Sequence, residues 1–170
     1  MDTTIAMPYV LGPGQERSHP GTWPTIKAGA ADTGGAMTVV AGALGPWESG
    51  PPLHVHDHAD ECMYVLAGQL LVQIGQDIHT LEAGSFAWLP RRTPHTFANA
   101  GPAPVRMFGV TSPGGIEEFF AAQSTYLASV HGPPDPAELA RLAAGWGTVL
   151  GPPICAVSAS PSSQPGVAAP

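Results

Sequence analysis

Glycine and proline interrupt this chain so often that few long helices or strands have room to form. Its 170 residues include 21 glycines and 20 prolines. Between residues 36 and 111, short apolar or alternating runs are separated by such turns at intervals of roughly eight to twelve residues. Successive short runs of this kind predict β-strands that pack as a sandwich or a barrel. The predicted fold class is therefore all-β.

The strands can be placed along the chain from these runs. Gly68-Gln69 separates two of them at the spacing of a tight hairpin. The N-terminal residues are irregular apart from a short edge strand expected over 23–27. The strands expected in the body are 36–44, 61–67, 70–74, 78–81, 85–89, 95–98 and 105–111.

Two helices are expected after the strands. Apolar residues recur at steps of three and four over 116–130, which is typical of a helix with one buried face. Asp135, Pro136 and Glu138 have the spacing of a capped helix start. The chain then divides into an N-terminal arm (1–35), a barrel with the site (36–112), helices packed on the outside of the barrel (113–150) and a disordered tail (151–170), which is rich in Ala, Ser, Pro and Gly.

Charge and apolar content exclude some partners. Lys and Arg number 6 and Asp and Glu 13, which gives a net charge of −7. A negative chain without a basic run is repelled by nucleic acid and by anionic membranes. No apolar run is long enough to span a bilayer, and the first residues lack the features of a signal peptide, so a cytoplasmic location is expected.

Two histidines one residue apart form the core of the expected site. In a strand, the side chains of His54 and His56 project from the same face, with Cα atoms roughly 6.6 Å apart. Glu61 lies five residues after His56, so in an uninterrupted strand its side chain would project from the opposite face. It joins the histidines only if the chain turns or bulges over the polar residues 57–60. His95, from a later strand, is the expected fourth ligand.

Three imidazoles and one carboxylate are the ligands expected for a divalent transition metal. Such a set suits Fe, Mn, Co, Ni, Cu or Zn, and the residue types do not choose among them. Four protein ligands leave one or two coordination positions open on an ion that takes five or six. An open position is the mark of a catalytic metal site.

Around these ligands the chain resembles the cupin superfamily. The first cupin motif is Gly, five residues, His-x-His, three or four residues, Glu, six residues, Gly; His54, His56, Glu61 and Gly68 fit it, but its first glycine falls on Glu48. The second is Gly, five residues, Pro-x-Gly, two residues, His, three residues, Asn; Gly84, Pro90, His95 and Asn99 fit it, with Arg92 in place of the inner glycine. The resemblance implies a jelly-roll β-barrel and a homodimer.

Within cupins, the spacing of the ligands and the apolar strands resemble the quercetin 2,3-dioxygenase group. That resemblance implies a metal-dependent dioxygenase that uses O₂ on a flavonol-like or other enolic aromatic molecule. Glu61 would be both a ligand and a general base, with its basicity raised by a dry site. In an extended chain, the side chain of His58 would project from the same face as those of His54 and His56. It would then relay protons or replace Glu61 as a ligand; the alternative is that it is simply solvated.

The substrate pocket is expected to be apolar. Strand alternation places Met63 and Val65 on the metal side of their strand and Phe97 on the metal side of its own, and Trp47 could close the mouth. Each of these residues could instead be ordinary barrel core. Arg92 would either pair with an anionic substrate at the mouth or be solvated.

Two other functions use the same metal site. An isomerase, cyclase or lyase would act on an enolisable, polyketide-like small molecule without O₂, with the ion polarising a carbonyl. A binding protein would hold a small ligand without turnover. Oxygen uptake separates the first of these from a dioxygenase.

Overall fold

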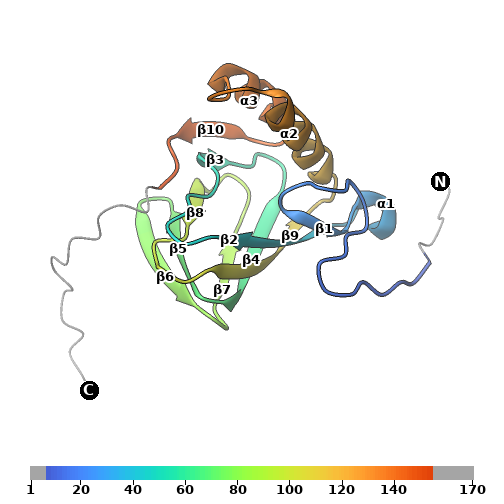
Figure 1. Ribbon diagram of the computed structural model, residues 1–170, viewed down its shortest axis with the longest axis horizontal. Coiled ribbons are helices and arrows are strands. Elements are labelled where there is room, and N and C mark those ends of the chain that lie inside the picture. The colour runs from blue at the N-terminus through green and yellow to red at the C-terminus, as the bar shows by residue number, and fades with distance from the viewer. Residues whose placement is uncertain (1–6, 155–170) are drawn as a thin grey trace, which may run out of the picture.

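The computed structural model describes residues 7–154, and its body is a barrel of two five-stranded sheets. One sheet has the strand order β1-β2-β9-β4-β7 and the other β10-β3-β8-β5-β6, with neighbours antiparallel. The strands wrap around a common interior (Figure 1), which confirms the expected all-β class. Their bounds are β1 Thr25–Ala28, β2 Thr38–Leu44, β3 Leu53–Val55, β4 Asp60–Ala67, β5 Gln69–Ile74, β6 Asp77–Glu82, β7 Phe86–Leu89, β8 His95–Ala98, β9 Val105–Ser112 and β10 Thr148–Gly151.

Side chains that alternate along the strands fill the barrel. In β4, Met63 and Val65 are buried, whereas Tyr64 and Leu66 are exposed on the outer face. This is the pattern of a strand with one face toward a core. Removing the inner side chains from water is the main favourable contribution to folding. The buried cluster consists of Leu44, Met63, Val65, Leu70, Val72, Leu89, Phe97, Val105 and Met107.

Gly68 links the two sheets and does not close a hairpin. β4 pairs with β7 and β9, and β5 pairs with β6 and β8, so the hairpin expected at Gly68-Gln69 is wrong. The φ angle of Gly68 is 79°, and a Cβ atom there would lie 2.5 Å from the carbonyl oxygen of Pro104. Only glycine fits this left-handed, crowded turn.

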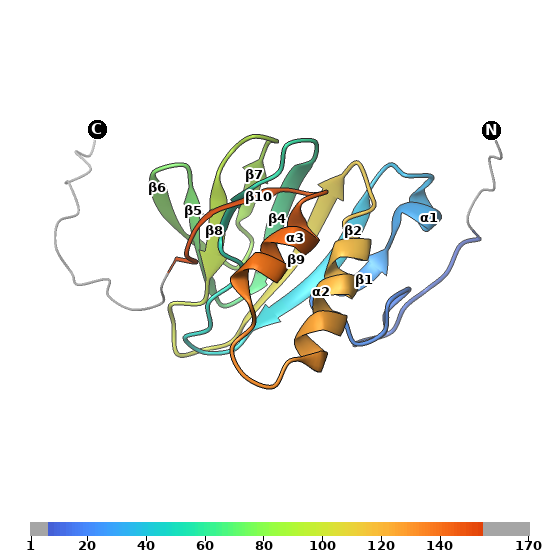
Figure 2. The same cartoon turned by 90° about the horizontal axis from the view of Figure 1, so that it is seen from above.

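The helices cover one end of the barrel. α2 (Glu117–Ser129) and α3 (Pro136–Ala143) occupy the stretches where helices were expected, and α1 (Ala30–Thr33) is a short addition. The sequence places these helices on the outside of the barrel and does not specify which part of the barrel they cover. Figures 1 and 2 show them over the end of the barrel where β3 lies, and their side chains line a cavity there.

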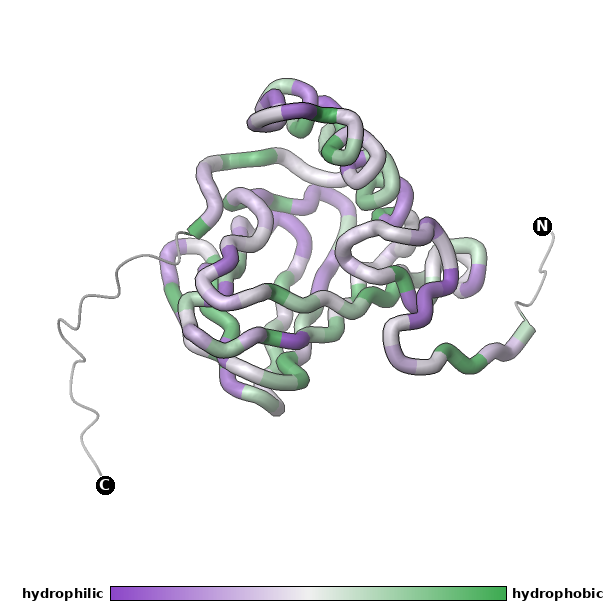
Figure 3. The backbone as a smooth tube through the Cα atoms, viewed as in Figure 1, coloured by the Kyte–Doolittle hydropathy of each residue, from purple (hydrophilic) through white to green (hydrophobic). Residues whose placement is uncertain are grey.

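β10 completes this cover and was not expected from the sequence. It pairs antiparallel with β3, and in Figure 3 it is a hydrophobic segment lying across the barrel end. We call residues 117–151, which include α2, α3 and β10, the roof. Gly151 ends β10, and residues 155–170 of the expected tail lie outside the described residues. No helix in the described part of the chain is long and apolar enough to span a membrane.

A buried carboxylate fastens α2 to the barrel. Glu117 is 4% exposed and accepts hydrogen bonds from the Thr38 hydroxyl and from the backbone N–H groups of Ala30 and Gly115. Burial raises the pKa of Glu117, but the hydrogen bonds from Thr38 and Ala30 outweigh burial and hold the pKa below its ordinary value. This one side chain therefore ties together α1, β2 and α2.

Candidate metal centre

Four side chains meet at the end of the barrel beneath the roof. His54 lies on β3, His56 directly after it, Glu61 on β4 and His95 on β8. One donor atom of each lies within 4.8 Å of the donor atoms of the other three. His54 and His95 are paired across β3 and β8, with ring centroids 4.3 Å apart. The structure thus brings together the four residues that the sequence predicts as ligands.

Glu61 reaches this cluster because the chain turns between β3 and β4. β3 and β4 belong to opposite sheets, so the parity of a single strand does not apply across residues 56–59. Asp60 fixes the start of β4, since its carboxylate accepts hydrogen bonds from the guanidinium and the backbone N–H of Arg91. These bonds from Arg91 lower the pKa of Asp60 to about 2. The turn required by the sequence pattern is therefore present.

Backbone carbonyls orient all three imidazoles. Nδ1 of His54 lies 2.8 Å from the oxygen of Pro52, and Nδ1 of His95 lies 2.8 Å from the oxygen of Thr93. A carbonyl can only accept, so each Nδ1 carries hydrogen and each Nε2 is left to bind an ion.

The support of His56 comes from the roof. Its Nδ1 lies 2.9 Å from the carbonyl oxygen of Trp146, 90 residues later in the chain. This contact gives His56 the same orientation as the other two imidazoles. The metal centre and the roof therefore share one hydrogen bond.

The cluster fits a divalent transition metal. Nε2 of His95 is buried and makes no hydrogen bond among the described residues, although it lies 3.5 Å from Oε2 of Glu61. A buried nitrogen with a free lone pair is costly unless a partner satisfies it. A bound ion would supply that partner, and three imidazoles with one carboxylate suit Fe, Mn, Co, Ni, Cu or Zn.

Electrostatics prepare these groups to coordinate. Burial and the neighbouring His95 lower the pKa of His54 to about 4, so this imidazole is neutral near pH 7. Burial also acts to lower the pKa of His56, but the hydrogen bond to Glu61, 3.2 Å away, raises it above its ordinary value. Binding of an ion would therefore compete with protonation of His56.

The pKa of Glu61 corrects an expectation from the sequence. Burial alone would raise this pKa, as expected for a dry site, but the contacts with His56 and His95 outweigh burial and lower it. Glu61 is consequently ionised at neutral pH. It is available as a ligand and as a proton acceptor, but it is a weaker base than the sequence predicted.

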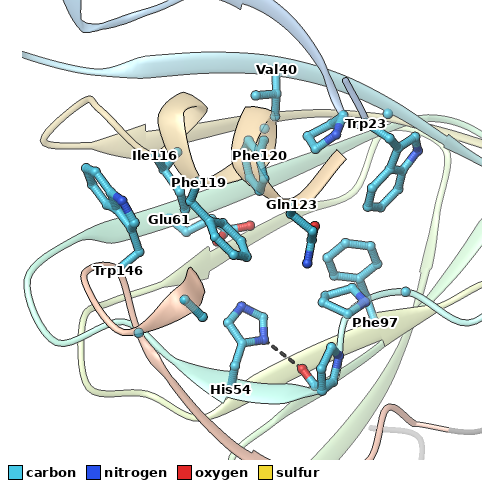
Figure 4. A pocket seen from close by; sticks show the side chains of 18 of the residues that line it. Trp23, Val40, His54, Glu61, Phe97, Ile116, Phe119, Phe120, Gln123 and Trp146 are labelled. Atoms are coloured by element: carbon cyan, nitrogen blue, oxygen red, sulfur yellow. Dashed lines mark hydrogen bonds between the residues drawn. The ribbon is translucent and has the colours of Figure 1, made fainter. Parts of the chain in front are cut away.

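The cluster opens into a cavity of about 430 Å³ between barrel and roof. Figure 4 shows aromatic rings on several sides of this space, with His54 and Glu61 on the barrel side. The volume is within the range of small-molecule sites. No lysine or arginine is among the described residues that line it. The aromatic lining residues are Trp23, Phe97, Phe119, Phe120 and Trp146.

The other predicted site residues divide into two groups. Met63 and Phe97 line the cavity, with both side chains mostly buried. Val65 is fully buried in the barrel core, one inward position beyond Met63, and does not reach the cavity. Trp47 is 58% exposed in a turn, and His58 is exposed in the turn before β4. Neither of these two lines the cavity or joins the ligand cluster.

Several lining residues were not predicted as part of the site. Phe119, Phe120 and Gln123 were read as the buried face of a helix, and Trp146 as part of the next one. Trp23 belongs to the arm, and its indole N–H donates to the carbonyl oxygen of Ala43. The sequence carried no signal for their place in the cavity, because a helix residue that lines a cavity and one that packs in a core have the same spacing.

The two departures from the cupin motifs have structural explanations. Arg92 has a φ of 66°, so it adopts the left-handed conformation of the glycine it replaces, and its N–H donates to the carbonyl oxygen of His56. Near Glu48, the close backbone approach occurs at Gly50, where a Cβ atom would lie 2.4 Å from the carbonyl oxygen of Phe97. Arg92 is exposed and does not line the cavity.

Part of the chain is similar to known proteins. Residues 42–111 match the Cupin domain family. The uncharacterized protein MJ1618 of Methanocaldococcus jannaschii is 26% identical over 109 residues, 62% of this chain and 79% of that protein. A solved structure from Klebsiella pneumoniae, an uncharacterized conserved protein with a double-stranded β-helix domain, is 24% identical with a TM-score of 0.50, covering 59% of this chain and 84% of its own. TT1209 from Thermus thermophilus is 27% identical with a TM-score of 0.47, covering 55% and 82%.

Proposed function

We propose, from the premise that residues 42–111 form a cupin barrel, that this protein is a metal-dependent dioxygenase for flat, enolic, flavonol-like aromatic molecules. One observation carries the proposal: the four-ligand cluster opens directly into an aromatic-lined cavity of about 430 Å³. An apolar space with a few polar groups at one side favours a planar ligand with its oxygen atoms toward the cluster.

His54, His56, Glu61 and His95 would hold the ion. When bound, a redox-active ion supplies a Lewis-acidic centre for the enol oxygen and a route for electrons between the substrate and dioxygen. Ring opening of the enol places both oxygen atoms of O₂ in the products. The electrons that reduce O₂ come from the cleaved carbon–carbon bonds, so no external reductant is needed.

The side chains of this protein would have three tasks. Glu61, ionised at neutral pH, accepts the enol proton. Phe97 and Phe119 would hold the aromatic plane from opposite sides of the cavity. The roof would exclude bulk water, which strengthens the electrostatic interactions inside.

The lining also argues against phosphorylated substrates. A phosphate group usually needs arginine, lysine or a helix N-terminus to balance its charge. The described lining residues include neither arginine nor lysine, and their charged groups belong to Glu48, Glu61 and the histidines. A neutral or weakly acidic aromatic ligand meets no such mismatch.

Oxygen uptake tests the proposal. Protein loaded separately with Fe, Mn, Co, Ni, Cu and Zn would be mixed with 3-hydroxyflavone in an oxygen electrode while the flavonol absorbance is followed. We expect equimolar loss of O₂ and flavonol with at least one redox-active metal and none with zinc. Turnover that continues unchanged without O₂ would establish a non-oxidative isomerase, cyclase or lyase instead. Tight binding without turnover would establish a binding protein.

A further inference from the structure

Helix α2 directs one polar side chain into the apolar part of the cavity. Four residues of α2 line the cavity, at the spacing of a single helix face, and α3 adds Leu139 and Ala143. Of these six, only Gln123 is polar. The four from α2 are Phe119, Phe120, Gln123 and Leu127.

The amide of Gln123 lies across the cavity from the metal centre. Figure 4 shows it extending from the helix side into the space between Phe119 and Phe97, with His54 on the barrel side. The cavity thus has polar groups on both sides and aromatic rings between them. A ligand that fills it would meet the ion at one end and an amide at the other.

The amide is not used to hold the fold together. Other polar side chains of α2 have structural partners: Ser124 accepts from the backbone N–H of Trp23, and the Tyr126 hydroxyl accepts from that of Asp135. Gln123 makes no side-chain hydrogen bond within residues 7–154. The amide is half-buried and is therefore available to pair with water or with a ligand that enters the cavity.

We propose that Gln123 is a distal subsite that hydrogen-bonds a second polar group of the ligand. The proposal rests on the function proposed above and narrows the substrate class. An amide both donates and accepts, so it pairs well with a hydroxyl group. The substrate would be a flat aromatic molecule with chelating oxygens at one end and a hydroxyl at the other, such as a flavonol with a hydroxyl on its pendant ring.

Two flavonols that differ by one hydroxyl test this subsite. Binding of 3-hydroxyflavone and 3,4′-dihydroxyflavone would be measured by calorimetry without oxygen, using zinc-loaded protein. We expect the wild type to bind the dihydroxy compound about tenfold more tightly, the typical effect of one well-placed hydrogen bond. Gln123→Leu should bring the two affinities together by weakening only the dihydroxy compound.

Controls separate recognition from folding. Thr125→Val alters the exposed face of the same helix and should keep the tenfold preference. Gln123→Asn shortens the amide and should reduce the preference without reversing it. Thermal unfolding of each variant would verify that the roof is intact. Equal affinities in the wild type, a preference that survives in Gln123→Leu, or no binding of either flavonol would overturn the subsite.

The result is independent of turnover. A tenfold preference together with no oxygen uptake would keep the subsite and reject the dioxygenase. Oxygen uptake without a preference for the dihydroxy compound would support the dioxygenase and reject the subsite.

Discussion

The metal centre and the roof face each other across one cavity but are built in different ways. His54 and His95 are paired on adjacent strands, and each is oriented by a carbonyl two residues earlier in the chain. The roof comes from residues beyond the matched domain of 42–111. Contacts distant in sequence attach it to the barrel: the pairing of β10 with β3, the hydrogen bonds of Glu117 and that of the Trp146 carbonyl. The metal centre is thus held largely by contacts between residues near one another in the sequence, and the roof by contacts between residues far apart.

This difference separates two properties of the protein. The chemistry available to the site depends on barrel residues whose spacing is fixed by strand geometry. In the proposed function, the choice of small molecule depends on helix residues whose placement depends on a few buried polar contacts. Variants that damage one region and spare the other test this division.

Replacing a ligand should have the largest effect. In His95→Ala the ion loses a donor, and affinity for the metal should fall by well over the roughly 100-fold cost of losing a supporting hydrogen bond. Elemental analysis of purified protein and metal titration measure the loss. His79→Ala, which removes an exposed imidazole on β6, should leave metal content unchanged. Normal metal content in His95→Ala would refute the site.

Detaching the roof should destabilise the protein without removing the metal ligands. Glu117→Ala leaves the Thr38 hydroxyl and the backbone N–H of Ala30 without an acceptor, which should cost about 3 kcal/mol in the free energy of unfolding. Urea unfolding measures this loss. The neighbouring exposed Glu118→Ala should change stability by less than about 0.5 kcal/mol. Equal stability of the two variants would show that Glu117 does not anchor the roof.

Acid should weaken the same anchor to a smaller extent. The pKa of Glu117 is lowered in the folded protein, so its stabilising contribution is complete above the unfolded value near 4.5 and is lost as pH falls through the folded value. Protonation leaves a carboxyl group in place, so the loss should be smaller than in Glu117→Ala. Urea midpoints from pH 7 down to pH 3 would show it. Glu117→Gln should flatten this dependence, and an equally steep profile would assign it to other carboxylates.

The hydrogen bond shared by roof and centre should have a moderate effect. In Gly147→Ala, a Cβ atom would lie 2.4 Å from the carbonyl oxygen of Val55, so β10 must move and take the Trp146 carbonyl away from His56. We expect metal affinity to fall roughly 10-fold. Gly145→Ala, where a Cβ atom meets nothing within 4 Å, is the matched control. Equal affinities would show that the centre does not depend on the roof.

Relieving the turn at Arg92 should have the smallest effect. Arg92→Gly removes the strain of a left-handed conformation but adds freedom to the unfolded chain, so stability should rise by no more than about 1 kcal/mol. Urea unfolding measures the gain. Arg92→Ala removes the charge and keeps the strain, and it should give no gain. A loss of stability in Arg92→Gly would mean that the arginine side chain itself supports the turn.

The same division explains what the sequence could predict. The ligands were predictable because alternation and spacing place His54 and His56 on one face and because the turn after them is polar. The helices were predictable from their apolar period. An apolar stripe, however, shows only that one face of a helix is buried and not what it is buried against, so the sequence did not predict which part of the barrel α2 and α3 cover.

Other differences arise from long-range pairing. Thr148–Gly151 was not predicted as a strand, and it forms one by pairing with β3, a partner far away in the sequence. Gly68 joins strands of different sheets, which adjacency in sequence does not reveal. Val65 has the inward parity of Met63, but it lies one step deeper, where the barrel is solidly packed.

The carbonyl of Trp146 has a practical consequence for anyone who trims this chain. A fragment cut at the limits of the matched domain would retain every coordinating atom, yet one imidazole would be free to rotate and the hollow above the ion would be open to solvent. Such a fragment would be suited to measuring bare coordination, and the full length would be needed to measure selectivity. The boundaries of a recognisable module and those of a working pocket are different in this protein.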